Sequence, residues 1–146
     1  MLKRLSIASD RREQFIDVTA EVAAAVRSSG VSSGTVTLFV PHTTAAVTIN
    51  ENADPSVVGD IIKGLAEIAP HRAAHYRHRE GNSDAHIKSS LVGPAVQVII
   101  EQSEPLLGTW QGIYFCEFDG PRSRQLWVKV QGDPPPAEVR GRLVGP

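Results

Sequence analysis

The chain has 146 residues, of which 41% are apolar, and it carries 15 basic and 16 acidic side chains. This length and composition fit one globular domain with a core that needs no disulfide or structural metal. The near-neutral charge argues against a general nucleic-acid binder, which would show a basic stripe. No apolar run approaches the roughly 20 residues that span a bilayer, and we expect no signal peptide and no membrane partner. Cys116 is the single cysteine, which excludes an internal disulfide and favours a reducing, cytoplasmic location.

The first part of the chain alternates between strand and helix patterns. Residues 3–8 predict a strand, and residues 14–16 predict a short second strand. From Val18 the apolar residues recur at helical spacing, and Gly30 is a plausible end for that helix.

A strand pair and a strong helix are predicted next. Residues 35–40 are β-branched and partly alternating, which predicts a strand, and residues 46–49 are expected to be its partner. Asp54 is the expected N-cap of the following helix, with Pro55 at its first helical position. Pro70 should end it.

The second half predicts a loop, a short helix and more strands. Residues 71–83 form a polar, histidine-rich loop, and Ser83 or Asp84 could cap a helix that runs to Leu91. Three β-rich runs follow, punctuated by Gly and Pro: residues 95–101, 108–118 and 125–131. The pattern predicts a compact single α+β domain over residues 1–132, with a mainly antiparallel sheet and two to three helices. Residues 133–146, rich in Pro, Gly and Arg, are expected to form a tail.

All five histidines fall between positions 42 and 86. His42 follows a predicted strand, His78 lies in the polar loop, and His86 lies where a helix N-terminus disfavours added positive charge. Three neutral imidazoles could form an open catalytic metal site. The alternative is an ordinary surface or hydrogen-bonded histidine at each place. His71 and His75 would form a rival pair only on a continued helix, so we favour ordinary roles for both.

Carboxylates near these histidines are candidates for acid–base work. Glu51, Glu80 and Asp84 lie in the same part of the chain, and each would need to reach a proton within hydrogen-bonding distance. Asp54 is better explained as a helix cap. Asp84 fits a helix cap and a ligand equally well.

Cationic and hydroxyl groups could bind phosphate. Lys88 and Ser89 lie near a predicted helix start, and Arg122 and Arg124 follow the turn at Gly120-Pro121. Arginine binds phosphate oxygens with a planar fork, lysine acts as a point charge, and helix-start N–H groups favour anions. The alternative is a set of solvated surface charges.

Two further residues have open roles. Trp110 lies in a turn-like element and could stack on a planar ring, lie at a subunit contact or fill the core. Cys116 lies in a predicted strand and is expected to be buried and inert.

These motifs, in this order, resemble the YjbQ-like family, whose members are described as secondary thiamine-phosphate synthase enzymes. The resemblance covers about residues 3–132. His71, His75 and the Pro-rich tail lie outside it. The matching motifs are His42-Thr43-Thr44, Asn50-Glu51-Asn52-Ala53-Asp54-Pro55, Tyr76 with His78, Glu80-Gly81, His86-Ile87-Lys88-Ser89-Ser90, Gly108-Thr109-Trp110-Gln111-Gly112-Ile113, and Gly120-Pro121-Arg122 with Arg124.

The resemblance implies a homotrimer of α+β domains with a polar, histidine-lined pocket near the subunit interface. It also implies a reaction that joins a pyrimidine methyl pyrophosphate to a thiazole phosphate. We therefore expect catalytic roles for His42, His78, His86 and Glu51, and a divalent metal, zinc or magnesium, on the three histidines. We expect a small phosphorylated substrate to contact a further set of residues: Thr43, Thr44, Lys88, Ser89, Trp110, Arg122 and Arg124. A metal-dependent hydrolase and a non-enzymatic trimeric ligand binder remain alternatives, because a family does not dictate chemistry.

Overall fold

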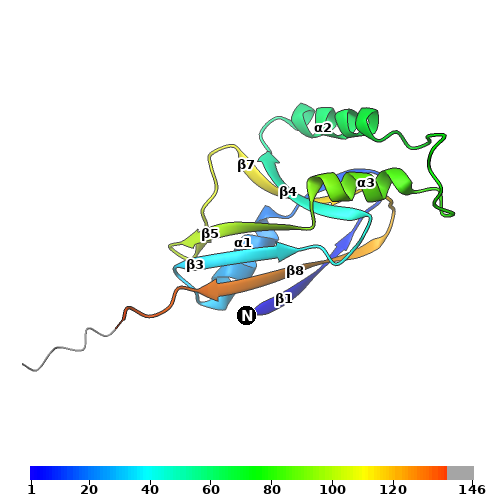
Figure 1. Cartoon of the computed structure of the whole chain (residues 1–146). Helices are drawn as coiled ribbons and strands as arrows, with labels where there is room; N and C mark the ends of the chain where they lie inside the picture. Colours follow the sequence, from blue (N-terminus) through cyan, green and yellow to red (C-terminus); the bar gives the residue numbers. More distant parts are fainter. Residues whose placement is uncertain (138–146) are drawn as a thin grey trace, which may run out of the picture.

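Two antiparallel sheets and three helices make up the part of the chain that the structure describes, residues 1–137 of a computed structural model (Figure 1). The larger sheet has the strand order β1-β8-β3-β5-β6 and the smaller one β2-β7-β4. The predicted α+β class is confirmed. The predicted tail falls largely on residues 138–146, which lie outside the described residues.

The strands of the larger sheet come from both ends of the chain and from its middle. Val36 of β3 lies opposite Val98 of β5 on one side and opposite Val130 of β8 on the other. The short β6 was not predicted. The strands are β1 (Leu2–Ala8), β8 (Ser123–Gly132), β3 (Gly34–Phe39), β5 (Ala95–Glu101) and β6 (Glu104–Pro105).

The smaller sheet places β7 (Gln111–Glu117) between β2 (Gln14–Asp17) and β4 (Ala45–Glu51). The prediction that residues 46–49 pair with residues 35–40 is wrong. β4 pairs with β7, because both edges of β3 are already filled by β5 and β8. Residues 40–44 therefore carry the chain from one sheet to the other, and this crossing contributes to the lining of a polar cavity.

The main core lies between the two sheets and under α1 (Thr19–Ser29). Alternate residues of the strands face it, as period-two patterning requires. Gly30 ends α1 in the left-handed conformation, with φ of 76°, which a glycine adopts without strain. The buried side chains of this core include Val22, Val26, Val36, Leu38, Val47, Phe115, Leu126 and Val128.

A second, smaller core lies on the other face of the smaller sheet, where α3 (Ser83–Val92) packs. Cys116 is fully buried there, as predicted, and burial raises the pKa of its thiol. Asn82, not Ser83 or Asp84, is the N-cap position of α3, because the Asp84 side chain binds Arg12 and Lys88 instead.

Helix α2 (Pro55–Ile68) begins as predicted, with the Asp54 carboxylate accepting a hydrogen bond from the Ser56 N–H at 2.9 Å. It lies at the outer edge of the molecule beside α3, and none of its residues is fully buried (Figure 1). Its strongly apolar sequence is therefore only partly covered. Among the described residues, no helix is both long and apolar enough to cross a membrane.

Candidate functional site

A polar cavity of about 610 Å³ opens where three connections meet: the crossing from β3 to β4, the loop before α3, and the turn from β7 to β8. Its volume lies within the range of small-molecule pockets. Two arginines, two acids and three histidines contribute to its lining. The residues are Phe39, Val40, Pro41, His42, Thr43, Thr44, His78, Glu80, Asn82, His86, Pro94, Asp119, Arg122 and Arg124.

His42 is held by the neighbouring strand. The backbone N–H of Gln125 on β8 donates a hydrogen bond to His42 Nε2 at 2.9 Å. Burial and, next, the positive charge of Arg124 lower the pKa of His42. A neutral imidazole whose Nε2 accepts carries its proton on Nδ1, so His42 is a hydrogen-bond donor through Nδ1.

His78, in the loop before α3, and His86, in the first turn of α3, lie against one another. Their ring centroids are 5.1 Å apart and the ring planes are inclined at 76°. A second, more apolar cavity of about 470 Å³ lies on their other side, next to Tyr76 and Ile87. The two imidazoles therefore form a wall that two cavities share.

The expected three-histidine metal site does not fit the described residues. Among residues 1–137, no group of three His, Cys, Asp or Glu side chains is arranged to hold an ion. His42 already uses Nε2 as an acceptor, which leaves only its protonated nitrogen. The His78–His86 spacing taken alone suits two ligands, since imidazoles on one tetrahedral zinc have centroids ~5 Å apart.

Arg124 and Glu117 form a buried pair behind the cavity, with side chains 6% and 0% exposed. Arg124 donates from Nε to Glu117 Oε1 at 2.9 Å and from Nη2 to Glu117 Oε2 at 2.5 Å. Nη2 also donates to Thr44 Oγ1 at 2.7 Å, which leaves the Thr44 hydroxyl hydrogen to donate elsewhere. Burial by itself would raise the pKa of Glu117. Hydrogen bonds from Arg124 and Ser9 outweigh burial, and the pKa is lowered.

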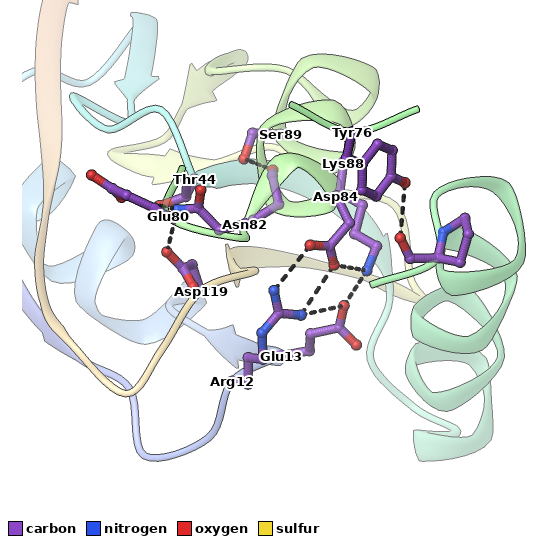
Figure 2. Close-up of polar contacts among 12 residues, drawn as sticks. Arg12, Glu13, Thr44, Tyr76, Glu80, Asn82, Asp84, Lys88, Ser89 and Asp119 are labelled. Carbon is purple, nitrogen blue, oxygen red and sulfur yellow. Dashed lines mark hydrogen bonds and ion pairs between the residues drawn. The ribbon is translucent and has the colours of Figure 1, made fainter. Parts of the chain in front are cut away.

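The turn from β7 to β8 supplies the opposite wall. Arg122 donates from Nε to the Asp119 carbonyl at 2.8 Å and from Nη2 to Asp119 Oδ2 at 3.0 Å. The Asp119 carboxylate also accepts from Asn82 Nδ2 at 2.8 Å (Figure 2). Gly120 has no room for a side chain, because a Cβ there would lie 2.3 Å from the Arg11 carbonyl oxygen and 2.6 Å from Ser9 Oγ. Half of the Arg122 side chain remains exposed, so it can bind a ligand.

Lys88 does not lie at the cavity. Its side chain is 1% exposed and forms ion pairs with Glu13 and, at 2.9 Å, with Asp84. Asp84 is fully buried and also accepts two hydrogen bonds of 3.0 Å from Arg12 (Figure 2). Burial by itself would raise the pKa of Asp84. The bonds from Arg12 and Lys88 outweigh burial and lower it. Glu13 and Asp84 therefore already neutralise the charge of Lys88, which does not face a ligand in the cavity as the sequence had predicted.

The other predicted residues divide into two groups. Thr43 and Ser89 line a small side cavity of about 280 Å³ together with His42 and His86. Glu51 at the end of β4 and Trp110, which is 64% exposed, lie outside the lining of these cavities.

Three residues at or just behind the cavity wall were missed by sequence reasoning: Asn82, Glu117 and Asp119. Glu117 interrupts an apolar run in β7, and a charge in such a run must be paired if it faces inward. The two arginines that follow Gly120-Pro121 were a signal for that pairing. Asn82 had no comparable signal, because its role depends on the distant Asp119.

Comparison with known proteins agrees with the fold. The family described as "UPF0047 protein YjbQ-like" matches residues 3–133. The chain belongs to this family. Its YjbQ-like relatives include a UPF0047 protein of Methanocaldococcus jannaschii, 53% identical over 133 residues that cover 91% of this chain and 96% of that protein. YugU of Bacillus subtilis is 50% identical over 132 residues, covering 90% and 100%.

Solved YjbQ-like structures are also similar. A protein of Clostridium acetobutylicum matches with a TM-score of 0.86 at 53% identity, covering 88% of this chain and 99% of that chain. A YbjQ-like protein of unknown function from Sulfolobus solfataricus matches with a TM-score of 0.87 at 27% identity, covering 91% and 97%. The fold is therefore shared by relatives whose sequences have diverged widely.

Proposed function

We propose that the 610 Å³ cavity is the active site of an enzyme acting on a small phosphorylated substrate, with a reaction of the thiamine-phosphate synthase type. One observation carries this proposal. His42, His78, His86 and Arg122, which are far apart in the sequence, all line this cavity. Proton-transferring and anion-binding groups together are what a phosphorylated substrate with an anionic leaving group needs.

In the proposed reaction, the bond between the pyrimidine methylene carbon and the pyrophosphate oxygen breaks. The pyrophosphate leaves with the electron pair, and the thiazole nitrogen bonds to the same carbon. The protein's task is to stabilise the negative charge that develops on the departing oxygen. Among residues 1–137, Asp119 engages two of the three Arg122 nitrogens, which leaves Nη1 for a phosphate oxygen. His42 would donate a further hydrogen bond from Nδ1.

The test is product formation by the purified protein from the two phosphorylated precursors. We expect His86→Ala to lower turnover roughly hundredfold, the scale of losing an acid–base group. Arg122→Gln should raise KM for the pyrophosphate substrate. His71→Ala is the matched control, because His71 is exposed and lies outside the cavity lining. Absence of thiamine phosphate would rule out this specific reaction, and unchanged turnover in His86→Ala would rule out this site for it.

A metal-dependent hydrolase of a small phosphorylated or acyl substrate is the second candidate. The distance of 5.1 Å between the ring centroids of His78 and His86 supports it. Imidazole ligands favour zinc over magnesium. Elemental analysis of the purified protein tests it directly. Stoichiometric zinc that is lost in both His78→Ala and His86→Ala would favour this reading, and no metal together with no gain on adding zinc would count against it.

We also propose a cytoplasmic homotrimer, the assembly that the family resemblance implies. The partly covered apolar face of α2 supports it, together with Ile68 and Leu91, which are 68% and 57% exposed. An exposed apolar surface of this kind commonly marks a subunit contact.

The third candidate is a non-enzymatic trimeric binder of small ligands. It is favoured if phosphorylated ligands raise the melting temperature of the protein but the protein converts none of them.

A further inference from the structure

Asn82 is a buried amide at the wall of the cavity. It is 5% exposed and precedes α3, where its backbone carbonyl accepts the Ala85 N–H at 3.0 Å. Its side chain makes no helix-capping hydrogen bond, although asparagine is among the residues that most often do so. The amide is therefore used for something other than the helix.

The orientation of the Asn82 amide is determined by two carboxylates. Nδ2 donates to Asp119 Oδ2 at 2.8 Å and to Glu80 Oε2 at 3.4 Å (Figure 2). Ionised carboxylates only accept hydrogen bonds, so a flipped amide would set its oxygen against two acceptors. The amide nitrogen must therefore be the atom that contacts the acids, and the amide oxygen, bonded to the same carbon, lies beside it without contacting them.

That oxygen lacks a partner. Asn82 Oδ1 is buried and accepts no hydrogen bond, and it is the one side-chain atom of this kind among residues 1–137. A buried acceptor without a donor costs free energy, and native proteins hold few of them. A group brought by a ligand would remove this cost, which gives the ligand-bound state an advantage that the free protein lacks.

We propose that Asn82 Oδ1, with the carboxylates of Glu80 and Asp119, forms an acceptor corner that binds an amino group of the substrate. This inference rests on the proposed function, in that the cavity is taken as the substrate site. All three groups offer lone pairs, and an amino group supplies hydrogens and positive polarity. A hydroxyl group also brings lone pairs, which the two carboxylates repel. The pyrimidine of the proposed reaction carries an exocyclic amino group and meets this requirement.

The acceptor corner must open slightly to admit its ligand, because Oδ1 is shielded from solvent. Glu80 is the side chain that can move most easily, since it is exposed and its contact with Asn82 is the long one, at 3.4 Å. The shorter bond to Asp119 would keep the amide oriented during this movement.

The experiment compares ligands that differ only at the amino group. Calorimetry would measure Kd for the aminopyrimidine methyl phosphate and for its oxo analogue, in which an acceptor replaces the amino group. A second pair is phosphoethanolamine and propyl phosphate. We expect the wild-type protein to bind the amino member of at least one pair about tenfold more tightly, a difference of about 1.4 kcal/mol.

The variants assign that preference to the amide. Asn82→Leu has a similar volume and should reduce the Kd ratio to about one. Asp119→Asn offers a second test, because a neutral amide partner lets Asn82 flip and should also reduce the ratio. Gln97→Leu, the same kind of change on an exposed residue of β5, should keep the wild-type ratio.

Each result bears on the inference. Equal affinity within both pairs in the wild-type protein would overturn it, and so would a preference that survives in Asn82→Leu and Asp119→Asn. Binding of none of the four probes would overturn it as well. A preference that depends on Asn82, in a protein that forms no thiamine phosphate, would uphold the acceptor corner and reject only the proposed reaction.

Discussion

The backbone N–H of Gln125 donates a hydrogen bond of 2.9 Å to Nε2 of His42. This bond joins β8 to the crossing between the two sheets, so the fold itself decides which imidazole nitrogen carries the proton. A histidine bound in this way is a donor through Nδ1, which is why His42 fits hydrogen bonding to an anion better than metal ligation.

Nuclear magnetic resonance of the imidazole nitrogens should find His42 neutral at pH 7, with the proton on Nδ1. Burial and the nearby Arg124 lower the pKa of His42 below its ordinary value of 6.5, so it should charge only under more acidic conditions. The His42→Ala spectrum assigns the signals. A proton on Nε2 at neutral pH would contradict the hydrogen bond from Gln125.

Glu117→Gln should lower the free energy of unfolding by about 3 kcal/mol, because it leaves the buried Arg124 charge without its counter-ion. Urea unfolding measures this loss. Glu104→Gln is the matched control: it breaks an Arg–Glu pair of the same kind with Arg27, but both side chains are about half exposed. That change should cost roughly 0.5 kcal/mol or less. Equal losses in the two variants would contradict the role of burial.

The free energy of unfolding should fall in acid, and Asp84 should account for part of the fall. The pKa of Asp84 is lowered in the folded protein, so the unfolded chain binds its proton first. Its contribution is therefore complete above the ordinary value of 3.8 and is lost as pH falls toward the lowered pKa. Asp84→Asn should be less stable at neutral pH and should show a shallower decline below about pH 4. An unchanged slope would contradict the shift.

Lys88→Met should weaken the fold and leave anion binding intact. Lys88 is buried between Asp84 and Glu13, and removing its charge should cost about 3 kcal/mol of unfolding free energy. Its folded fraction should bind inorganic pyrophosphate with the wild-type Kd. Arg122→Gln should show the opposite pattern, because Arg122 is half exposed at the cavity. Weaker pyrophosphate binding by Lys88→Met would contradict this assignment and would support a role for Lys88 in binding the substrate.

Replacing Ile68 and Leu91 together by Glu should reduce the molecular mass in solution from trimer to monomer, as measured by light scattering. Both side chains are largely exposed, and charges there would have to be buried without partners in an assembly that covers them. Glu67→Lys, on the polar face of α2 with Asp60 and Lys63, is the control and should stay trimeric. A wild-type protein that is monomeric at micromolar concentration would contradict the proposed assembly.

Local elements were largely predictable because their signals are short-range. Asp54 and Pro55 mark the start of α2, and Gly30 marks the end of α1, at positions that depend on neighbouring residues alone. The partner of β4 was not predictable in this way. Strands adjacent in the chain commonly pair, but β3 has both edges occupied by strands from later in the sequence.

For the candidate site, too, some residues were predictable from local sequence and others were not. The motif histidines, Thr43, Thr44, Arg122 and Arg124 could be picked out by residue type and order, and the structure brings them to one group of adjoining cavities. Lys88 could not be excluded from the sequence, because a lysine near a helix start is usually solvated. In the structure Lys88 is buried, and it is paired with Asp84 of the same helix and with Glu13, which lies 75 positions away.

The class of fold, the ends of the helices and the types of side chain that line the pocket could be predicted from the sequence alone. Each of these depends on neighbouring residues and on apolar periodicity. Only the tertiary structure decided which charges stay available to a ligand. Arg124 is neutralised by Glu117 across the turn from β7 to β8, and Lys88 by Asp84 of its own helix and by the distant Glu13. Among the described residues, Arg122 and the unpartnered oxygen of Asn82 remain for a ligand. Burial in a poorly solvating interior makes that decision, because it forces these charges to pair, and burial depends on the packing of segments that are far apart in the chain.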